Sequence, residues 1–286
     1  MYNPLNFSFS GTYRRLTSSS RTLPDFAVIG FPKCGTKSLF SYVTQHPNIG
    51  VPTSYGRSFF NVNYHRGLGW YKSHYPTVEN KKKLKKESGE YFFGDYSASY
   101  MMWYESALKI KKVMPKVKLI VVLRNPVDRA YSQFNFKEQG RFRETIDNPE
   151  TYFSDAIKDD ERRLKNWEYM IDNNLINRQN HVATKTPYLT MGKYAIHLKE
   201  WFKVFPKEQF HFVPTDEMSN EINIQKTVSK VYKFLGLPDY EINDFSRKNV
   251  GSYERIDEKQ RDKVKDFYKP WNAELEEMLG MKFNWN

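Results

Sequence analysis

Short apolar runs along the chain predict buried strands. Residues 25–30 (DFAVIG), 118–123 (KLIVVL) and 209–213 (QFHFV) are the clearest runs, and residues 91–93 (YFF) indicate another. Their length and their content of β-branched and aromatic residues favour strands over helices. The run at 118–123 is continuously apolar after its first residue, which is typical of a parallel strand covered on both faces.

Segments with helical spacing alternate with these runs. A helix is predicted over 36–45, and another begins at Pro126, is capped by Asn125 and runs to about Gln139. Further helices are predicted at about 154–173, 192–205, 220–235 and 257–279. Strands that alternate with helices predict an α/β fold.

The loop after the first strand differs by one position from a nucleotide-triphosphate loop. It reads GFPKCGTKS over residues 30–38, and one extra residue, Thr36, separates Gly35 from Lys37. A loop between a strand and a helix N-terminus collects unpaired backbone N–H groups and the positive end of the helix dipole. We therefore expect a phosphate site here, with an ordinary strand–helix turn as the alternative.

The side chains of this loop suit a phosphate in a shifted register. Thr36 and Ser38 can donate hydroxyls, Lys33 and Lys37 bring charge, and Gly35 lets the backbone approach closely. In a Walker loop the lysine directly follows the second glycine and reaches the β- and γ-phosphates. Because that register is broken, Lys33 is predicted to meet the far side of a shorter 5′-phosphate group.

A second strand end carries another candidate anion site. The run at 118–123 is followed by Arg124 and by a helix that presents Arg129 and Ser132. Ligands of open parallel sheets bind at the carboxyl ends of the strands. Two sites at two strand ends suit a nucleotide with separate phosphates, such as 3′,5′-bisphosphorylated adenosine. A triphosphate requires a metal-binding aspartate, and the sequence offers neither that residue at a strand end nor a ligand cluster with metal spacing.

These segments together resemble a known family, the PAPS-dependent sulfotransferases, where PAPS is 3′-phosphoadenosine 5′-phosphosulfate. FPKCGTKSL (31–39) is similar to the family's 5′-phosphosulfate loop, and VVLRNPVDRAYSQF (121–134) to its 3′-phosphate motif. The chain is most similar to the heparan sulfate and carbohydrate branch, also in FFNVNYHRGLGWY (59–71), in residues 192–218 and in LEEMLGMKFNWN (275–286).

The resemblance implies a three-layer α/β fold, P-loop-like, with a central, mostly parallel sheet flanked by helices. It implies one sulfotransferase domain over residues 23–286, after an irregular arm at residues 1–22. The activity implied is transfer of a sulfuryl group from PAPS to a hydroxyl or amine of a glycan or small-molecule acceptor. The transfer is an in-line displacement that needs no metal, because a lysine stabilises the charge on the leaving oxygen.

The resemblance also implies site residues. Lys33 would be catalytic and contact the bridging oxygen and the transferring sulfuryl group. The 5′-phosphate would be held by Cys34, Gly35, Thr36, Lys37 and Ser38. Arg124 and Ser132 would hold the 3′-phosphate. A segment that closes over the nucleotide would contribute Arg247, Lys248, Gly251, Ser252 and Tyr253, with Val250 where a lysine is common in the family.

Two departures from the family pattern leave the general base open. Gly56 stands where carbohydrate members have a catalytic glutamate, and Tyr96 where they often have a lysine that meets an anionic sugar. Both argue against heparan-like acceptors. Asp95 is the first candidate base, with helix capping or pairing with a lysine as the alternative role. His65 is the second candidate, with a structural role in its loop as the alternative.

Composition and charge limit the kinds of partner that this protein is expected to have. The net charge of +12 favours an anionic partner (a nucleotide, a polyanion or a membrane surface), with a generally solvated basic surface as the alternative. The lysine run at 81–86 indicates a solvated loop or helix face. Cys34 is the only cysteine, so no intramolecular disulfide can form. With no apolar signal core or spanning segment, we expect a soluble, cytoplasmic protein without a nucleic-acid partner, unless an N-terminal anchor has been lost.

Three hypotheses follow from the sequence. The first is an active PAPS-dependent sulfotransferase. The second is a protein of the same fold that has lost its base and binds a nucleotide or polyanion, which Gly56 favours. The third is a P-loop kinase or NTPase, which the extra Thr36 and the missing metal-binding aspartate disfavour. The acceptor and the oligomeric state are not predicted.

Overall fold

The computed structural model describes residues 9–136, 188–248, 251, 253 and 255–285. The chain divides into two compact units. The first comprises residues 1–123 and 200–249, and the second comprises residues 124–199 and 250–286. The helix predicted at about 154–173 lies outside the described residues.

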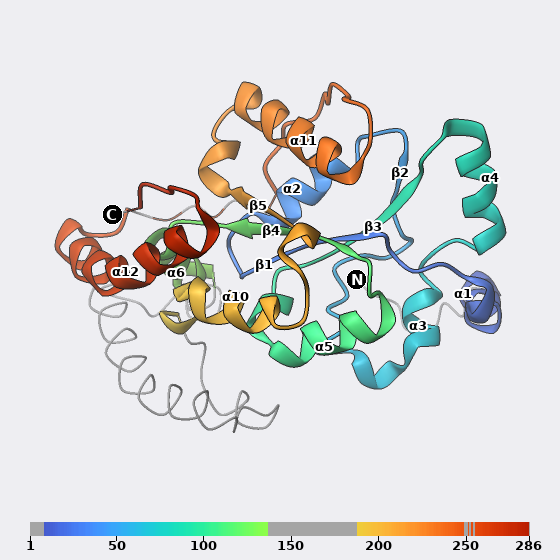
Figure 1. The fold of residues 1–286 in the computed structure, drawn as a ribbon, viewed down its shortest axis with the longest axis horizontal. Coiled ribbons are helices and arrows are strands. Elements are labelled where there is room, and N and C mark those ends of the chain that lie inside the picture. The colour runs from blue at the N-terminus through green and yellow to red at the C-terminus, as the bar shows by residue number, and fades with distance from the viewer. Residues whose placement is uncertain (1–8, 137–187, 249–250, 252, 254, 286) are drawn as a thin grey trace. The chain divides into compact units, whose positions relative to one another are not determined.

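A parallel sheet forms the centre of the first unit. Its strands are β1 (Phe26–Gly30), β2 (Ile49–Gly50), β3 (Phe92–Ser97), β4 (Lys118–Leu123) and β5 (Phe210–Pro214). They are arranged in the order β2-β3-β1-β4-β5 (Figure 1). Every pairing between these strands is parallel. The α/β fold with a mostly parallel sheet, predicted from the alternating pattern, is confirmed.

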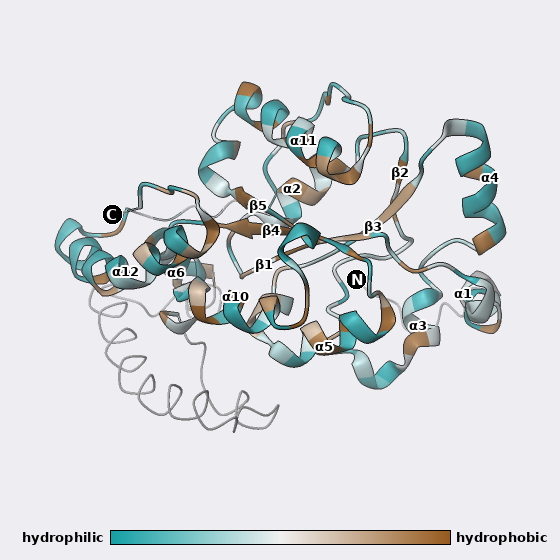
Figure 2. Cartoon of the chain, viewed as in Figure 1, coloured by the Kyte–Doolittle hydropathy of each residue, from teal (hydrophilic) through white to brown (hydrophobic). Residues whose placement is uncertain are grey.

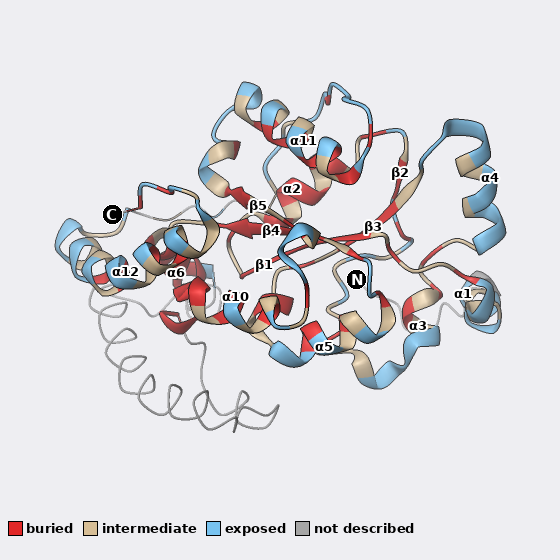
Figure 3. Cartoon of the chain, in the orientation of Figure 1, coloured by how far each residue is buried: buried red, intermediate tan, exposed pale blue. Residues whose placement is uncertain are grey.

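Burial explains why the central strands read as continuous apolar runs. Every residue of β1 is buried, and so is every residue of β4 after Lys118. The sheet accordingly stands out as apolar and buried in Figures 2 and 3. A strand flanked by two others and covered on both faces has no position at which a charged side chain can reach solvent.

One strand is longer than the sequence pattern predicted. The run at 91–93 indicated a short strand with Asp95 after it, whereas β3 continues to Ser97 and includes Asp95. The polar residues in its second half end the apolar pattern, but Gly94 and Asp95 pair with Phe26 and Ala27 of β1. Tertiary pairing therefore decides this strand end.

Helices cover both faces of the sheet in the first unit. They are α2 (Thr36–Val43) and α11 (Glu221–Leu235) on one side, and α3 (Leu68–Lys72) and α5 (Tyr104–Val113) on the other, as Figure 1 shows. The hydroxyl of Tyr232 on α11 donates toward Val43 O at 3.3 Å, which ties these two helices together. The predicted layers of helix, sheet and helix are confirmed.

The N-terminal arm is not irregular as predicted. Residues Phe9–Leu16 form helix α1. Its partner is distant in sequence, because Arg14 Nη1 donates to Ser73 O at 3.5 Å. Arg21, which is 6% exposed, donates to Tyr75 O at 2.6 Å. Contacts with residues 73–75 thus order a segment whose own composition gives little helical signal.

The second unit is built around α6 (Pro126–Phe134) and α12 (Glu258–Leu279). Asn125 caps α6 as predicted, since its side chain accepts from Val127 N at 3.0 Å. The unit has an apolar core in which these helices meet the segment at 188–189, made of Val127, Ala130, Tyr131, Phe134, Tyr188, Leu189, Val264 and Tyr268. The predicted extension of α6 to Gln139 lies outside the described residues. Helix α10 (Tyr194–Phe202) lies within the range predicted from spacing, and helix α4 (Val78–Ser88) of the first unit contains the lysine run at 81–86.

Close packing at Gly94 makes a testable prediction. A Cβ atom at Gly94 would lie 2.4 Å from Phe26 Cζ and 2.9 Å from Phe40 Cε2. Gly94→Ala should therefore lower the free energy of unfolding by about 1–3 kcal/mol, measured by urea denaturation. The control is Gly11→Ala in α1, where nothing lies within 4 Å of the added atom and the helix should gain about 0.5–1 kcal/mol. Similar changes for both variants would contradict the packing of β3 on β1.

Candidate functional site

The loop between β1 and α2 contains two residues in the left-handed region. Lys33 has φ 71° and Gly35 has φ 90°. Gly35 is the N-cap residue of α2 and provides no side-chain cap. A residue other than glycine in this region costs of order 1–3 kcal/mol and persists where the surrounding structure fixes it. The predicted loop therefore forms a strained turn at a helix N-terminus, where anions bind favourably.

Thr36, the first residue of α2, has an unsatisfied hydroxyl. The residue is 2% exposed, and its Oγ1 atom is buried without a hydrogen-bond partner among the described residues. Leaving a buried hydroxyl unpaired costs of order 1–3 kcal/mol. The neighbouring Lys37 forms no ion pair with any residue that the structure describes. An unsatisfied hydroxyl and a lysine that pairs with no described acid thus lie at one helix N-terminus.

The position of Cys34 is fixed by a threonine from another strand end. The hydroxyl of Thr215 lies 2.6 Å from Cys34 O and 2.9 Å from Leu123 O, so it can donate to either carbonyl. This contact ties the loop to the carboxyl end of β4. Cys34 as a whole is fully buried, and its contribution to the cofactor site stays a prediction. Thr215 was not predicted from the sequence, although a hydroxyl directly after an apolar run at 209–213 was a usable signal.

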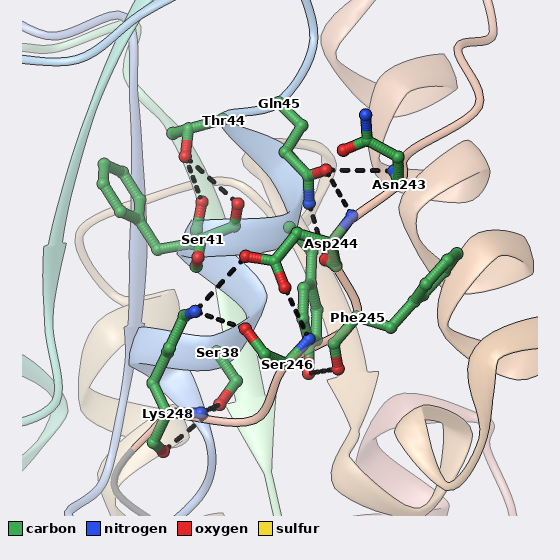
Figure 4. Close-up of polar contacts among 11 residues, drawn as sticks. Ser38, Ser41, Thr44, Gln45, Asn243, Asp244, Phe245, Ser246 and Lys248 are labelled. Atoms are coloured by element: carbon green, nitrogen blue, oxygen red, sulfur yellow. Dashed lines mark hydrogen bonds and ion pairs between the residues drawn. The ribbon is translucent and has the colours of Figure 1, made fainter.

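Ser38 contacts the segment that contains Arg247 and Lys248, which was predicted to bind the same nucleotide as the β1–α2 loop. Its hydroxyl oxygen accepts from Lys248 N at 2.9 Å, and Lys248 Nζ lies 3.3 Å from Asp244 Oδ2 (Figure 4). Arg247 donates to Ser219 O at 2.7 Å. The structure therefore brings Arg247 and Lys248 beside α2, as the predicted closing segment requires, while their side chains contact protein groups.

The segment before Lys248 is held by Tyr42 of α2 and by Gln45, which follows this helix. Gln45 Nε2 donates to Asp244 O at 2.8 Å, and its Oε1 accepts from Asn243 N at 3.1 Å (Figure 4). Tyr42 donates to Phe245 O at 3.1 Å. These backbone contacts fix the segment without using its charged side chains.

The second predicted anion site lies in the second unit. Arg124, which follows the last residue of β4, is half-buried, and its carbonyl accepts from Tyr194 Oη at 2.8 Å. Ser132 on α6 is 2% exposed. Arg129 is not presented to a ligand as the sequence indicated, because it is fully buried and its guanidinium donates to Gln133 Oε1 and to Tyr188 O. Arg129 therefore holds the 188 segment against α6.

The rest of the predicted closing segment is described in part. The ring of Tyr253 packs edge-on against Tyr131 of α6, with centroids 5.6 Å apart. A Cβ atom at Gly251 would lie 2.6 Å from Tyr253 Cε1, so a side chain there would require the Tyr253 ring to shift. Ser252 and Val250 lie outside the described residues.

Asp95 lies within β3 and is 2% exposed. Its Oδ2 atom accepts from Tyr71 Oη at 2.7 Å, and its Oδ1 atom from Tyr96 N at 2.8 Å. Burial raises the pKa of the Asp95 carboxyl from 3.8 to about 6, and hydrogen bonds from Tyr71, the Tyr96 and Gly56 N–H groups and Tyr100 limit the rise. The carboxylate neither caps a helix nor pairs with a described lysine; it sits in a shell of tyrosine hydroxyls.

The two departures from the family pattern lie against each other. Gly56 has φ 68°, and a Cβ atom there would lie 2.8 Å from both Cζ and Oη of Tyr96. Tyr96 also packs against Phe40 and Tyr55, with ring centroids 5.1 and 5.6 Å apart. Tyr96 thus fills the space that a side chain at position 56 would occupy, so the two residues depend on each other.

His65 is placed differently from Asp95. It lies in a short 3-10 helix, Tyr64–Arg66, and is exposed. It makes no hydrogen bond or ion pair with any described residue. An exposed, unpartnered imidazole has no group that would orient it for proton transfer, so nothing in the described geometry favours His65 over Asp95.

Comparison with known proteins agrees with this arrangement. A heparan sulfate glucosamine 3-O-sulfotransferase 3B1 from Homo sapiens is 26% identical over 310 residues, which cover 99% of this chain and 69% of that protein. A bifunctional heparan sulfate N-deacetylase/N-sulfotransferase 1 from Caenorhabditis briggsae is 29% identical over 231 residues. That match covers 79% of this chain, which spans only 24% of the relative's length.

The fold also matches a solved structure. A sulfotransferase from Alicyclobacillus acidocaldarius superposes with a TM-score of 0.66 at 23% identity, covering 92% of this chain and 99% of that one.

No helix in the part of the chain that the structure describes is long and apolar enough to span a bilayer.

The family assignment rests on most of the chain. Residues 23–269 match the sequence profile of the sulfotransferase domain, and this range includes the β1–α2 loop, β3 with Asp95, and α6. The relatives named above are sulfotransferases of the heparan sulfate branch, as the two phosphate motifs predicted. The chain therefore belongs to the sulfotransferase family.

Proposed function

We propose that this chain transfers a sulfuryl group from PAPS to a hydroxyl or amine of a glycan or small-molecule acceptor. The observation that carries the proposal is the turn before α2, where Lys33 and Gly35 are left-handed and the Thr36 hydroxyl is buried without a described partner. These groups suit a 5′-phosphosulfate, because one short segment supplies the backbone N–H groups of a helix end, the Thr36 hydroxyl and two lysines, Lys33 and Lys37.

The residues have distinct proposed tasks. Lys33 stabilises negative charge on the bridging oxygen as the sulfur–oxygen bond to the phosphate breaks and the bond to the acceptor forms. Gly35, Thr36 and Lys37 bind the 5′-phosphate. The leaving phosphate takes the electron pair of the broken bond, and the acceptor's proton passes to a base, for which Asp95 is our candidate.

Further residues complete the proposed donor site. Arg124 and Ser132 bind the 3′-phosphate, as their place in the family motif suggests. The bond from Lys248 N to Ser38 holds the segment at 243–248 against α2, and Arg247 holds it to Ser219 O, so we propose that these three residues position the site.

A second function is supported by one observation. Gly56 replaces a carboxylate, and Asp95 is almost completely buried. A chain that lacked an accessible base would bind the nucleotide or a polyanion without turnover. Product formation separates the two functions, because both predict that 3′,5′-bisphosphoadenosine binds.

Lys33 gives the first test of the reaction. Lys33→Ala should lower turnover of PAPS by on the order of 100- to 1,000-fold, because an electrostatic group at the leaving oxygen is lost. The assay is mass-resolved addition of SO₃ to a pooled panel of oligosaccharides, phenols, alcohols and amines. Lys83→Ala on α4, an exposed lysine, is the control and should be fully active. Unchanged turnover in Lys33→Ala would remove Lys33 from the mechanism.

Arg124 gives a test of the 3′-phosphate assignment. Arg124→Ala should weaken binding of 3′,5′-bisphosphoadenosine by roughly 10- to 100-fold, since one charged hydrogen bond contributes about 1.5–3 kcal/mol. Binding of adenosine 5′-monophosphate should change little. Calorimetry with both nucleotides, with the exposed Lys269→Ala on α12 as control, makes the comparison. Equal losses for both nucleotides would place the 3′-phosphate elsewhere.

The pH profile tests Asp95 as the base. Because its pKa is raised to about 6, kcat/KM should rise as the pH increases through about 6, and Asp95→Asn should abolish that limb along with most activity. The raised pKa also means that the folded chain binds this proton more tightly than the unfolded chain between pH 3.8 and about 6. The contribution of Asp95 to stability therefore falls as the pH rises through this range.

These two effects separate a catalytic from a structural carboxyl. A purely structural Asp95 would produce the stability effect, seen as a difference between the wild type and Asp95→Asn in urea denaturation across pH. It would leave kcat/KM without an acidic limb near pH 6, and in that case another base must be sought.

A further inference from the structure

Two segments of the chain carry cations and no acids. Residues 1–24 and residues 51–78 contain no aspartate or glutamate. Their arginines and lysine are Arg14, Arg15, Arg21, Arg57, Arg66 and Lys72. Such a composition leaves positive charge without compensation inside either segment.

The fold brings these two segments together. Arg21 and Thr77 form an antiparallel bridge, and Lys72 Nζ donates to Ser19 O at 3.0 Å. With the contact of Arg14 to Ser73 O, α1 and the chain after it lie against residues 72–77. The cations of both segments therefore act on one region of the first unit.

The pKa of His74 is affected by the positive charge of these segments. The pKa of His74 is lowered to about 4, mainly by burial and in addition by the charges of Arg57, Arg14, Arg15 and Arg66. Its Nε2 atom is buried without a hydrogen-bond partner among the described residues. Four guanidinium groups thus lie near enough to one imidazole to oppose its protonation.

The four arginines lack acidic partners. Arg57 donates to Ser54, and Arg66 lies over the Trp70 ring at 4.7 Å. None of the four forms an ion pair with a residue that the structure describes. Arg15, Arg57 and Arg66 are exposed, so their remaining donors can reach a ligand.

The lysine run at 81–86 differs from these arginines because several of its lysines have acidic partners. On α4 (Val78–Ser88), Lys81 pairs with Asp25, and Lys85 lies 2.7 Å from Glu90 Oε2. Lys83 lies 3.9 Å from Glu87. Acidic residues therefore compensate much of this run, whereas the arginines are uncompensated and offer the planar fork that matches sulfate and carboxylate.

One of these arginines, Arg57, lies next to the proposed acceptor site. Arg57 directly follows Gly56, whose N–H group bonds to Asp95. Ser97 at the end of β3 pairs with Ile29, one residue before the end of β1 where the Lys33 loop begins. An acceptor whose reacting group lies at this sheet edge can extend toward Arg57.

We propose that Arg14, Arg15, Arg57 and Arg66 form an anion-binding surface that holds sulfate or carboxylate groups of the acceptor outside the reacting unit. The inference rests on the proposed sulfotransferase function. It revises the expectation that Tyr96, in place of a lysine, disfavours anionic acceptors, because the positive charge is supplied by arginines from two other segments.

The test compares two triple variants with the same change in charge. Arg15→Gln/Arg57→Gln/Arg66→Gln removes three cations from the surface, and Lys82→Gln/Lys83→Gln/Lys86→Gln removes three exposed cations from α4. The probe is an oligosaccharide of sulfated dextran, with unsulfated dextran of equal length, and Kd is measured by calorimetry over a range of salt concentrations.

We expect the arginine variant to bind sulfated dextran about 10- to 100-fold more weakly, and the α4 variant to change less than about threefold, as for exposed charges. The dependence of log Kd on log salt concentration should become shallower by about 2–3 for the arginine variant. In the wild type, sulfated dextran should raise the pKa of His74 from about 4, followed by NMR, because bound anions offset the guanidinium charge. Unsulfated dextran should not bind measurably to the wild type and should not change the pKa of His74.

Three results would overturn the proposal: equal weakening in both variants, no weakening in the arginine variant, or binding of anionic vesicles with no binding of sulfated dextran. Binding of 3′,5′-bisphosphoadenosine, measured in parallel, should be the same in all three proteins. If the nucleotide fails to bind the wild type while the arginine effect is present, the donor assignment fails and the anion surface stands.

Discussion

The parallel pairing of β1 with β3 and β4 sets the positions of the Lys33 loop and of Asp95. Gly30 lies opposite Val122 of β4, and Ile29 lies opposite Ser97 of β3, so three carboxyl strand ends lie side by side. The Lys33 loop leaves from the middle one. Because both neighbours fix the direction of β1, the loop must turn sharply into α2, and left-handed residues make that turn possible.

Burial governs the chemistry of the neighbouring strand. Asp95 is placed inside β3, where its cost is offset by hydrogen bonds from tyrosine hydroxyls and backbone N–H groups, and its pKa is raised to about 6. Gly56 donates one of those bonds while leaving room for the Tyr96 ring. A carboxylate at position 56 would therefore require the Tyr96 ring to move or to be replaced by a smaller side chain, and it would strain the left-handed backbone there.

Charge is distributed by the fold in a way that composition does not indicate. The net charge of +12 includes lysines of α4 that face acids and arginines that face none. An exposed lysine near a carboxylate contributes little field at a distance. Guanidinium groups gathered from two acid-free segments act together, as the lowered pKa of His74 indicates.

The sequence by itself determined the α/β class, the central strands and the glycine turn before α2, because continuous apolar runs and a glycine turn before a helix are local signals. It predicted β4 residue for residue and the Asn125 cap. Only the tertiary structure decided that β3 includes Asp95, that residues 9–16 are helical, that Arg129 is buried and that Tyr96 fills the space beside Gly56. Each depends on a partner distant in sequence, whose contact satisfies a polar group or fills a volume that no local pattern records.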